Sequence, residues 1–350
     1  MTIEDLSAAG AAASCLADSP TSCQAHTRLY RAGRLVAGGF PVADISDHLA
    51  EPDTVVWLDL LRPSLEDMGV VVEEFGLHPL AIEDALHEHQ RPKLDRYPDH
   101  AFLAAYAVSC TMASDRGEPL LRTAEVAAFL TPRALITVRK EDLLDLQPLL
   151  DRWDSTPELA PSGVAFLAHG LVDHLVDGHT AAVAVLDDEA EDLEDLLFDE
   201  QQPSGDLQRR SFALRKALTQ LRRAVLPMRD VVGTMLRPEV GLVDERIAPY
   251  LRDVDDHVQR ATNDIDGLRD LLGTILDTNL TLASNRLNET IFRLTAYAAI
   301  LAATTAVTGY FGQNVPFPGS QQASGFLAST ILLIGSVVGL YAFFKRKGWL

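Results

Sequence analysis

Small and polar residues recur along one part of this 350-residue chain at alternating steps of three and four. They are Asp277, Thr281, Ser284, Asn288, Ile291, Thr295, Ala298, Ala302, Thr305, Gly309 and Gly312. Such steps place residues along one face of a helix, at the positions that a coiled coil fills with apolar side chains. Hydroxyl, amide and carboxylate oxygens are ligands that suit hard cations. The spacing therefore predicts a helix face, here called the polar stripe, that could contact a cation or its water shell.

Residues at the two ends of the polar stripe could select and stop an ion. The Asn314 amide, with carbonyls exposed where the helix ends at Gly312, could contact the water shell of Mg²⁺, which dehydrates reluctantly. Asn288 could repeat that contact at the other end. Ile291 and Leu294 could form an apolar constriction that closes by dewetting. Rings of these residues require several copies around one axis, so the sequence predicts a symmetric homo-oligomer.

A second interpretation of the small residues is close helix packing, with threonine hydroxyls bonded to their own helix. For Thr305 alone that interpretation is the simpler one. For the whole stripe, continuous with Asn288 and Asp277, a water-filled path is favoured, because polar residues in a membrane helix rarely face lipid. Gly335 and Gly339 form a separate pair of small residues, and we expect them to pack against the preceding span.

Carboxylates form a further candidate cation site at Asp253, Asp255 and Asp256. A solvated helix face would carry the same residues. The run from His87 to His89 lacks the spacing that puts two imidazoles on one helix face, so we interpret it as the surface end of a helix.

Two uncharged apolar segments, Leu294 to Phe311 and Phe326 to Phe344, carry or follow the stripe. Each is long enough to cross a bilayer, which takes roughly 20 helical residues. The loop between them is uncharged from Val315 to Gly325, whereas basic residues precede the first segment and follow the second. By the positive-inside rule, both termini are expected in the cytoplasm and the protein in the cell membrane.

One long helix is expected to enter the membrane without a break. From Leu251 to Leu280 apolar residues recur at three-to-four spacing, and no proline follows Pro249 before Phe311. A helix over 247–311 would be roughly 100 Å long, which predicts a stalk.

The preceding part combines strand and helix patterns. Strand candidates are 54–58, 101–108 and 134–138, and helices are expected over 64–75 and 79–87. After Ser162 the pattern is helical, with an acidic stretch at 187–200 and a basic one at 209–229 that we expect to fold back on each other. The predicted organisation is a disordered tail (1–26), a cytoplasmic α/β domain (27–162), its helical hairpin (163–246), the stalk and first transmembrane helix (247–311), an external loop (312–325), the second transmembrane helix (326–344) and a basic cytoplasmic tail (345–350).

Composition narrows the class of function. The net charge is −20, so we do not expect the basic patch that nucleic acid binding requires. Its three cysteines have no paired or metal-type spacing. No nucleophile elbow or phosphate-binding loop occurs, so the chain is not expected to be an enzyme.

Several motifs in order resemble the CorA family of divalent-cation transporters. The resemblance rests on the segments 75–84, 90–93, 252–257, 284–289 and 310–314, and on the basic residues 345–347. It implies a homopentameric funnel in the lipid bilayer, with the long helix around a central pore that is selective for hydrated Mg²⁺ and sometimes Co²⁺ or Ni²⁺. Gly312 and Asn314 match the family's signature, and Asp277 and Asn288 match pore-facing positions. The resemblance also implies that intracellular Mg²⁺ binds between the cytoplasmic domains of neighbouring subunits and closes the channel. Asp253 matches the acidic position with this regulatory role, and Asp256 is a further candidate ligand.

Gln313 departs from the methionine that is usual in the signature, and the outer loop lacks an acidic residue. A zinc-transporting branch of the same family also varies this position, so a Zn²⁺ transporter, with or without proton coupling, stays an alternative. A membrane-anchored scaffold that conducts nothing is the alternative from another class, but it has no need of the polar stripe.

Overall fold

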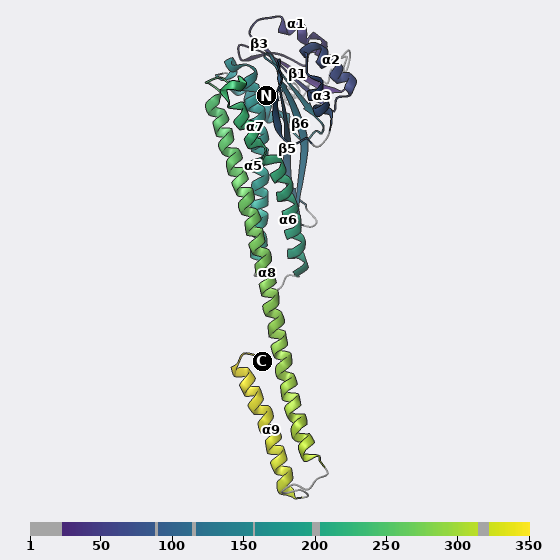
Figure 1. Cartoon of the computed structure of the whole chain (residues 1–350), viewed down its shortest axis with the longest axis vertical. Helices are drawn as coiled ribbons and strands as arrows, with labels where there is room; N and C mark the ends of the chain where they lie inside the picture. Colours follow the sequence, from purple (N-terminus) through teal and green to yellow (C-terminus); the bar gives the residue numbers. More distant parts are fainter. Residues whose placement is uncertain (1–22, 88–89, 114–116, 157, 198–203, 314–321) are drawn as a thin grey trace, which may run out of the picture. The chain divides into compact units, whose positions relative to one another are not determined.

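The computed structural model describes residues 23–87, 90–113, 117–156, 158–197, 204–313 and 322–350. The chain forms two compact units, Met1–Gly273 and Thr274–Leu350. An α/β part, a long helix and two apolar C-terminal helices are present, which confirms the predicted fold class (Figure 1).

The first unit is built on a seven-stranded sheet of order β2-β1-β3-β7-β6-β5-β4. The strands are β1 (Gln24–Arg31), β2 (Arg34–Gly38), β3 (Thr54–Leu61), β4 (Lys93–Arg96), β5 (Ala101–Met112), β6 (Pro119–Leu130) and β7 (Ala134–Arg139). β3 and β7 pair in parallel at the centre, and the other neighbours are antiparallel. All six residues of β7 are buried, as expected for a strand covered on both faces.

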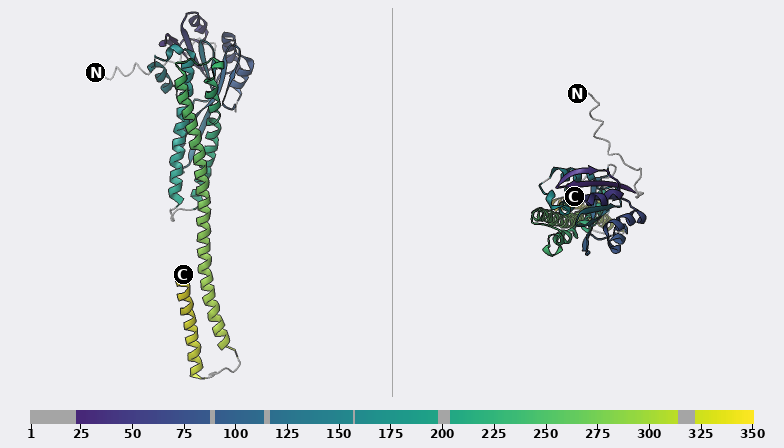
Figure 2. Two further views of the ribbon diagram at one scale, coloured as in Figure 1. Left: turned by 60° about the vertical axis from the view of Figure 1, so that its left-hand side comes forward. Right: turned by 90° about the horizontal axis from the view of Figure 1, so that it is seen from above.

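Helices cover both faces of this sheet. α1 (Ile45–Leu49), α2 (Leu65–Phe75) and α3 (Pro79–Leu86) pack with Leu58 and Phe102 in one core. α4 (Leu146–Ser155), α5 (Val164–Leu197), α7 (Met228–Met235) and the start of α8 (Ala248–Phe311) pack with Trp57 and Leu103 in the other. Neighbouring residues of one strand point to opposite faces. The first unit is therefore an α/β/α sandwich (Figures 1 and 2).

Local sequence explains where these helices begin and how closely they pack. Ser64 and Asp67 form a reciprocal capping box at the start of α2, and Gly76 ends that helix in the left-handed conformation. Gly170 of α5 lies under the Trp153 ring, and a Cβ there would lie 2.4 Å from the indole Nε1. Only glycine lets α4 and α5 approach this closely.

A buried ion pair joins the two parallel strands at the centre of the sheet. Arg139 Nη2 lies 2.8 Å from Asp59 Oδ2, and both side chains are almost fully buried. The Thr137 hydroxyl donates to Asp59 Oδ1 at 2.7 Å. Burial alone would lower the pKa of Arg139, but the hydrogen bonds and charge of Asp59 raise it above the ordinary value. The arginine is therefore charged in the core.

α5 and α6 (Ser204–Val225) lie side by side (Figures 1 and 2). Arg210 Nη2 lies 2.7 Å from the buried carboxylate of Glu189 and 3.4 Å from Asp192. These contacts join the acidic stretch to the basic one.

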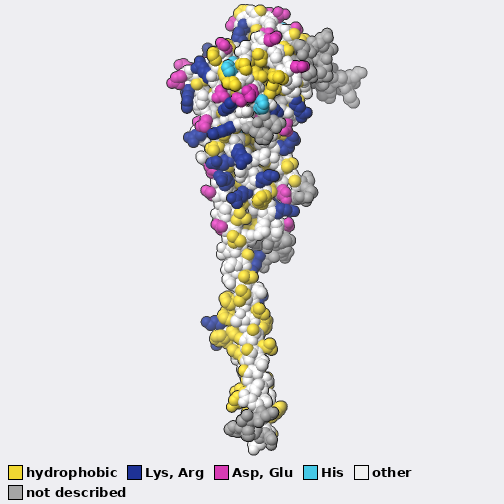
Figure 3. Space-filling model, turned by 45° about the vertical axis from the view of Figure 1, so that its right-hand side comes forward, with side chains coloured by type: hydrophobic (Ala, Val, Ile, Leu, Met, Phe, Trp, Pro, Cys, Tyr) yellow, Lys and Arg dark blue, Asp and Glu magenta, His cyan; other side chains and the backbone are white. Residues whose placement is uncertain are grey.

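The second unit contains the rest of α8 and α9 (Ala323–Arg346). Both helices are long and apolar enough to cross a membrane. Their large apolar side chains are mostly exposed in the single chain, as the yellow surface of this unit in Figure 3 shows. Near the C-terminus, Trp349 stacks on Phe292 and on Phe344, with ring centroids 4.9 and 5.4 Å apart.

Some expected boundaries are wrong. β1 begins at Gln24, inside the range assigned to the tail, because residues 24–26 pair with β3. α9 runs from Ala323 to Arg346, so the second span exceeds 326–344 at both ends and includes the first basic residues of the expected tail. Backbone pairing and helical hydrogen bonds, rather than side-chain polarity, set these limits.

Candidate ion path and metal site

The polar stripe is exposed along α8 and at Gly312, which follows that helix. All eleven of its residues are exposed in the single chain, and so is Leu294. The residues of α8 that are covered in the second unit include Ala296, Ala299, Ala303 and Val307. These belong to a face about 100° around the helix from the stripe, since each residue turns the helix by that amount. Packing within the single chain therefore does not account for the stripe.

The second helix presents a different face from the one expected. The covered residues of α9 are spaced by three and four and include Gly325, Leu333, Leu340 and Phe344. Gly335 and Gly339 are exposed, and a Cβ on either would meet nothing within 4 Å. Our expectation that this glycine pair packs against the first span is wrong for the single chain, because the covered positions of α9 are others.

Threonine hydroxyls of the stripe donate to their own helix. Thr305 Oγ1 donates to the Leu301 carbonyl at 2.9 Å, and Thr281 Oγ1 donates to the Asp277 carbonyl at 3.0 Å. A hydroxyl that has used its proton still carries lone pairs that can accept a hydrogen bond. These side chains therefore present acceptor oxygens, which is the chemistry that water around a cation requires.

The end of α8 explains the glycine of the signature. α8 ends at Phe311, and the Gly312 amide donates to the Thr308 carbonyl at 2.9 Å. A Cβ on Gly312 would lie 2.9 Å from that same carbonyl oxygen. Gly312 and Gln313 are exposed, whereas Asn314 lies outside the described residues.

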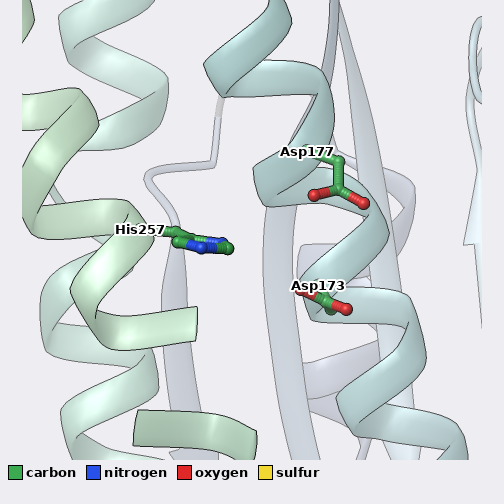
Figure 4. Close-up of side chains that lie close together, drawn as sticks. All are labelled: Asp173, Asp177 and His257. Atoms are coloured by element: carbon green, nitrogen blue, oxygen red, sulfur yellow. The ribbon is translucent and has the colours of Figure 1, made fainter. Parts of the chain in front are cut away.

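A cluster of three potential ligands lies in the first unit, between α5 and α8. Ligand atoms of Asp173, Asp177 and His257 all lie within 4.8 Å of one another (Figure 4). Asp173 and Asp177 stand one helical turn apart, so both carboxylates face the same neighbouring helix. Two carboxylates and an imidazole form a donor set that binds divalent metals. We call these residues the α5–α8 cluster.

Arg152 of α4 already offsets part of the negative charge of this cluster. It forms ion pairs with Asp173 and with Asp177, the latter at 2.7 Å. Burial raises the pKa of Asp173 above the ordinary aspartate value, and the charge of Arg152 opposes that rise. A divalent cation entering the cluster would compete with this guanidinium for the carboxylates.

The expected acidic residues lie unequally around the α5–α8 cluster. Asp253 Oδ2 lies 3.9 Å from His257 Nε2, so Asp253 extends the cluster along α8. Asp256 is exposed and has no ion pair within the described residues. Asp255 accepts a hydrogen bond from Gln259 at 2.7 Å. His87 ends α3, and the other two residues of its run fall outside the described part.

Sequence reasoning missed Asp173, Asp177 and His257 as a group. The only local signal was the pair of carboxylates at a spacing of four in a helix. Their approach to His257 depends on how α5 packs against α8, and no local pattern records it.

An α/β/α unit followed by two helices long and apolar enough to cross a membrane, the first of which carries the polar stripe, defines the class of membrane-embedded proteins with a folded domain outside the membrane. The chain belongs to the CorA family, whose model, described as CorA-like Mg²⁺ transporter protein, matches residues 52–346. This family consists of divalent metal ion transporters rather than enzymes.

Relatives with different named ions align over most of the chain. The putative metal ion transporter YfjQ of Bacillus subtilis is 28% identical over 308 residues, which cover 87% of this chain and 92% of the relative. The cobalt/magnesium transport protein CorA of Thermotoga maritima is 28% identical over 318 residues, covering 89% and 88%. The zinc transport protein ZntB of Yersinia pseudotuberculosis is 25% identical over 316 residues, covering 89% and 93%.

Solved structures share the fold. The complete CorA magnesium transporter of Methanocaldococcus jannaschii superposes with a TM-score of 0.70 at 17% identity, covering 93% of this chain and 98% of that one. The full-length CmaX protein superposes with a TM-score of 0.72 at 20% identity, covering 95% and 99%.

Proposed function

We propose that this protein is a channel-like Mg²⁺ transporter that works as a homopentamer in the cell membrane, with both termini in the cytoplasm. Five copies of α8 surround a central path, and each contributes its polar stripe. Mg²⁺ enters down its electrochemical gradient, at about 2.3 kcal/mol per elementary charge per 100 mV. Co²⁺ and Ni²⁺ are further candidate ions.

The exposure of the polar stripe carries this proposal. In the single chain the stripe is uncovered although α9 is packed on a neighbouring face of the same helix. Oxygen-bearing side chains in lipid are unfavourable, so a water-filled path between copies is the environment that suits them. A scaffold that conducts nothing would gain nothing from this face.

Selection takes place at the end of α8. Rings of Gly312 carbonyls, Gln313 and Asn314 present neutral oxygens to the water shell of the ion, and Mg²⁺ keeps most of that shell. Neutral rings bind weakly enough for the ion to leave. Asn288 repeats the contact deeper in the path, and Ile291 with Leu294 closes it.

Intracellular divalent ions bind to the first unit and thereby regulate the ion path. Asp253 and the α5–α8 cluster supply carboxylates and an imidazole on α8 and on α5. Because α8 also carries the polar stripe, an ion that fixes its first turns acts on the helix that lines the path. Asp256 is retained as a further candidate ligand.

Zn²⁺ transport is the second candidate function. The imidazole of His257 is a ligand that suits Zn²⁺ better than Mg²⁺. Relatives named as zinc transport proteins align over nearly the whole chain, and Gln313 stands where the magnesium signature has methionine.

Ion flux into liposomes that contain the purified protein tests the proposal. Mg²⁺, Co²⁺ and Zn²⁺ are compared with and without a proton gradient. Mg²⁺ entry that is independent of protons supports the channel, whereas Zn²⁺ entry that requires the gradient supports the second candidate. No flux of any ion, in protein that light scattering shows to be assembled, would leave the scaffold.

A further inference from the structure

Our expectation from the net charge of −20 that no basic patch forms is wrong, because basic side chains gather in one groove of the first unit. The groove has a volume of about 1330 Å³ and lies between α6, the middle of β5 and β6, and the segment that follows β7. Its basic lining residues are Arg91, Lys140, Arg215, Lys216, Arg222, Arg223 and Arg269, against two carboxylates, Glu125 and Glu141. Figure 3 shows Lys and Arg side chains concentrated on this face.

Four of these basic side chains already have carboxylate partners. Lys140 pairs with Glu125, Arg91 with Asp230, and both Arg222 and Arg269 with Asp266. Within the described residues, Arg215, Lys216 and Arg223 form no ion pair, and all three are exposed. This excess of positive charge is available to an anion.

The three unpaired side chains follow one edge of α6. Arg215 and Arg223 are eight residues apart, which corresponds to about 12 Å along a helix. Each guanidinium can bind phosphate oxygens through two parallel N–H donors, and Lys216 adds a compact charge between them. This length suits a chain of phosphate groups better than a single one.

An aromatic ring lies one turn before this basic row. Phe212 lines the same groove and is 73% exposed, which is unusual for a phenylalanine in a soluble unit. An exposed ring face can stack on a nucleobase. The volume also reaches that of a small-molecule site rather than of a flat protein contact.

We propose that this groove binds a polyphosphate anion, with Arg215, Lys216 and Arg223 on the phosphates, and that the preferred form is a nucleoside triphosphate stacked on Phe212. This function goes beyond ion transport. Mg²⁺ binds phosphate oxygens, so such an anion would link the cytoplasmic unit to the pool of phosphate-bound ion.

Titration calorimetry on the full-length protein in detergent, in Mg²⁺-free buffer, tests the groove. The probes are ATP and inorganic tripolyphosphate. The triple variant Arg215→Gln, Lys216→Gln, Arg223→Gln removes three charges while keeping good helix formers on the surface. We expect it to lose roughly tenfold or more in affinity for both anions, because it removes three charge-assisted contacts to phosphate oxygens.

The control changes Arg229, Arg237 and Arg260 to Gln. These arginines are exposed, lie outside the groove and have no ion pair within the described part of the unit. The control should bind both anions as tightly as the parent. An equal loss in the two triple variants, or no saturable binding by the parent, would overturn the proposal.

Two further readouts separate the sources of the anion. Phe212→Ala should weaken the binding of ATP and leave the affinity for tripolyphosphate unchanged. An unchanged affinity for ATP would remove the nucleoside from the proposal. If the parent binds neither anion and the groove variant alters the oligomer mass in light scattering, the groove is a contact with the acidic surface of another copy, and the proposal fails. None of these readouts depends on ion flux.

Discussion

The two units of this chain solve opposite problems of burial. The first unit encloses its own core on both faces of a sheet and buries a charged pair, Asp59 and Arg139, at the centre. The second unit leaves large apolar side chains and the polar stripe exposed on the same helix. A single folded chain in water accounts for the first pattern only. The second pattern suits lipid on one face and, in the proposed oligomer, other copies of α8 on another.

The strongest test of this difference places a bulky residue on the stripe. Ala302→Phe should reduce ion flux in liposomes to the level of protein-free vesicles, because five rings would meet at the axis. Ala328→Phe is the matched control, since Ala328 is also exposed but lies on α9 and not on the stripe. It should conduct like the parent. Equal flux through both variants, at equal oligomer mass, would mean that the stripe does not line the path.

The buried ion pair between Asp59 and Arg139 tests how the first unit stabilises a charge in its core. Asp59→Ala leaves Arg139 charged in the core with the exposed Asp142 as its remaining carboxylate partner among the described residues. The unfolding free energy should therefore fall by about 3–5 kcal/mol. The partner for comparison is Asp154→Ala, which breaks the partly exposed pair with Arg28 at 2.7 Å. That change should cost about 0–1 kcal/mol. Denaturant unfolding followed by tryptophan fluorescence measures both, and similar losses would contradict the role of the buried pair.

A buried histidine makes the first unit sensitive to acid. His179 is fully buried on α5, and its Nε2 lies 2.8 Å from the Tyr106 carbonyl. Burial lowers the pKa of His179 to about 4, although that hydrogen bond acts to raise it. The unfolded chain binds this proton near pH 6.5, so the folded state should lose up to about 3 kcal/mol as the pH falls from about 6.5 to 4.

His179→Gln keeps a donor to the carbonyl but does not titrate. Thermal unfolding of this variant between pH 7 and 4 should therefore show a smaller loss of stability than the parent does. The exposed His87→Gln is the control and should follow the parent. A variant at position 179 with the same pH dependence as the parent would assign the acid sensitivity to other groups.

Local periodicity made the second unit more predictable than the first. The polar stripe follows from spacing within one helix, and the apolar spans follow from length and composition. In the first unit, strands β3, β5 and β7 were predicted by their apolar runs, whereas the contact of Asp59 with Arg139 depends on which strands are neighbours. β1 was not predicted as a strand, because its first residues alternate weakly. Contacts between distant segments leave no local pattern, and the α5–α8 cluster is of this kind.

Substitutions in and beside the α5–α8 cluster have the smallest expected effect, and they test whether ion binding in the first unit acts on the second. Asp173→Asn and Asp253→Asn should each raise the Mg²⁺ concentration that protects the first unit from proteolysis by roughly tenfold, which corresponds to about 1.4 kcal/mol. Asp264→Asn removes an exposed charge elsewhere on α8 and should leave the protection unchanged. The raised pKa of Asp173 adds a direction: protons compete for this carboxylate above the ordinary aspartate range, so protection should weaken as the pH falls toward that range. Protection that stays the same in Asp173→Asn but weakens in Asp253→Asn would limit the regulatory ion to the exposed face of α8 and exclude α5.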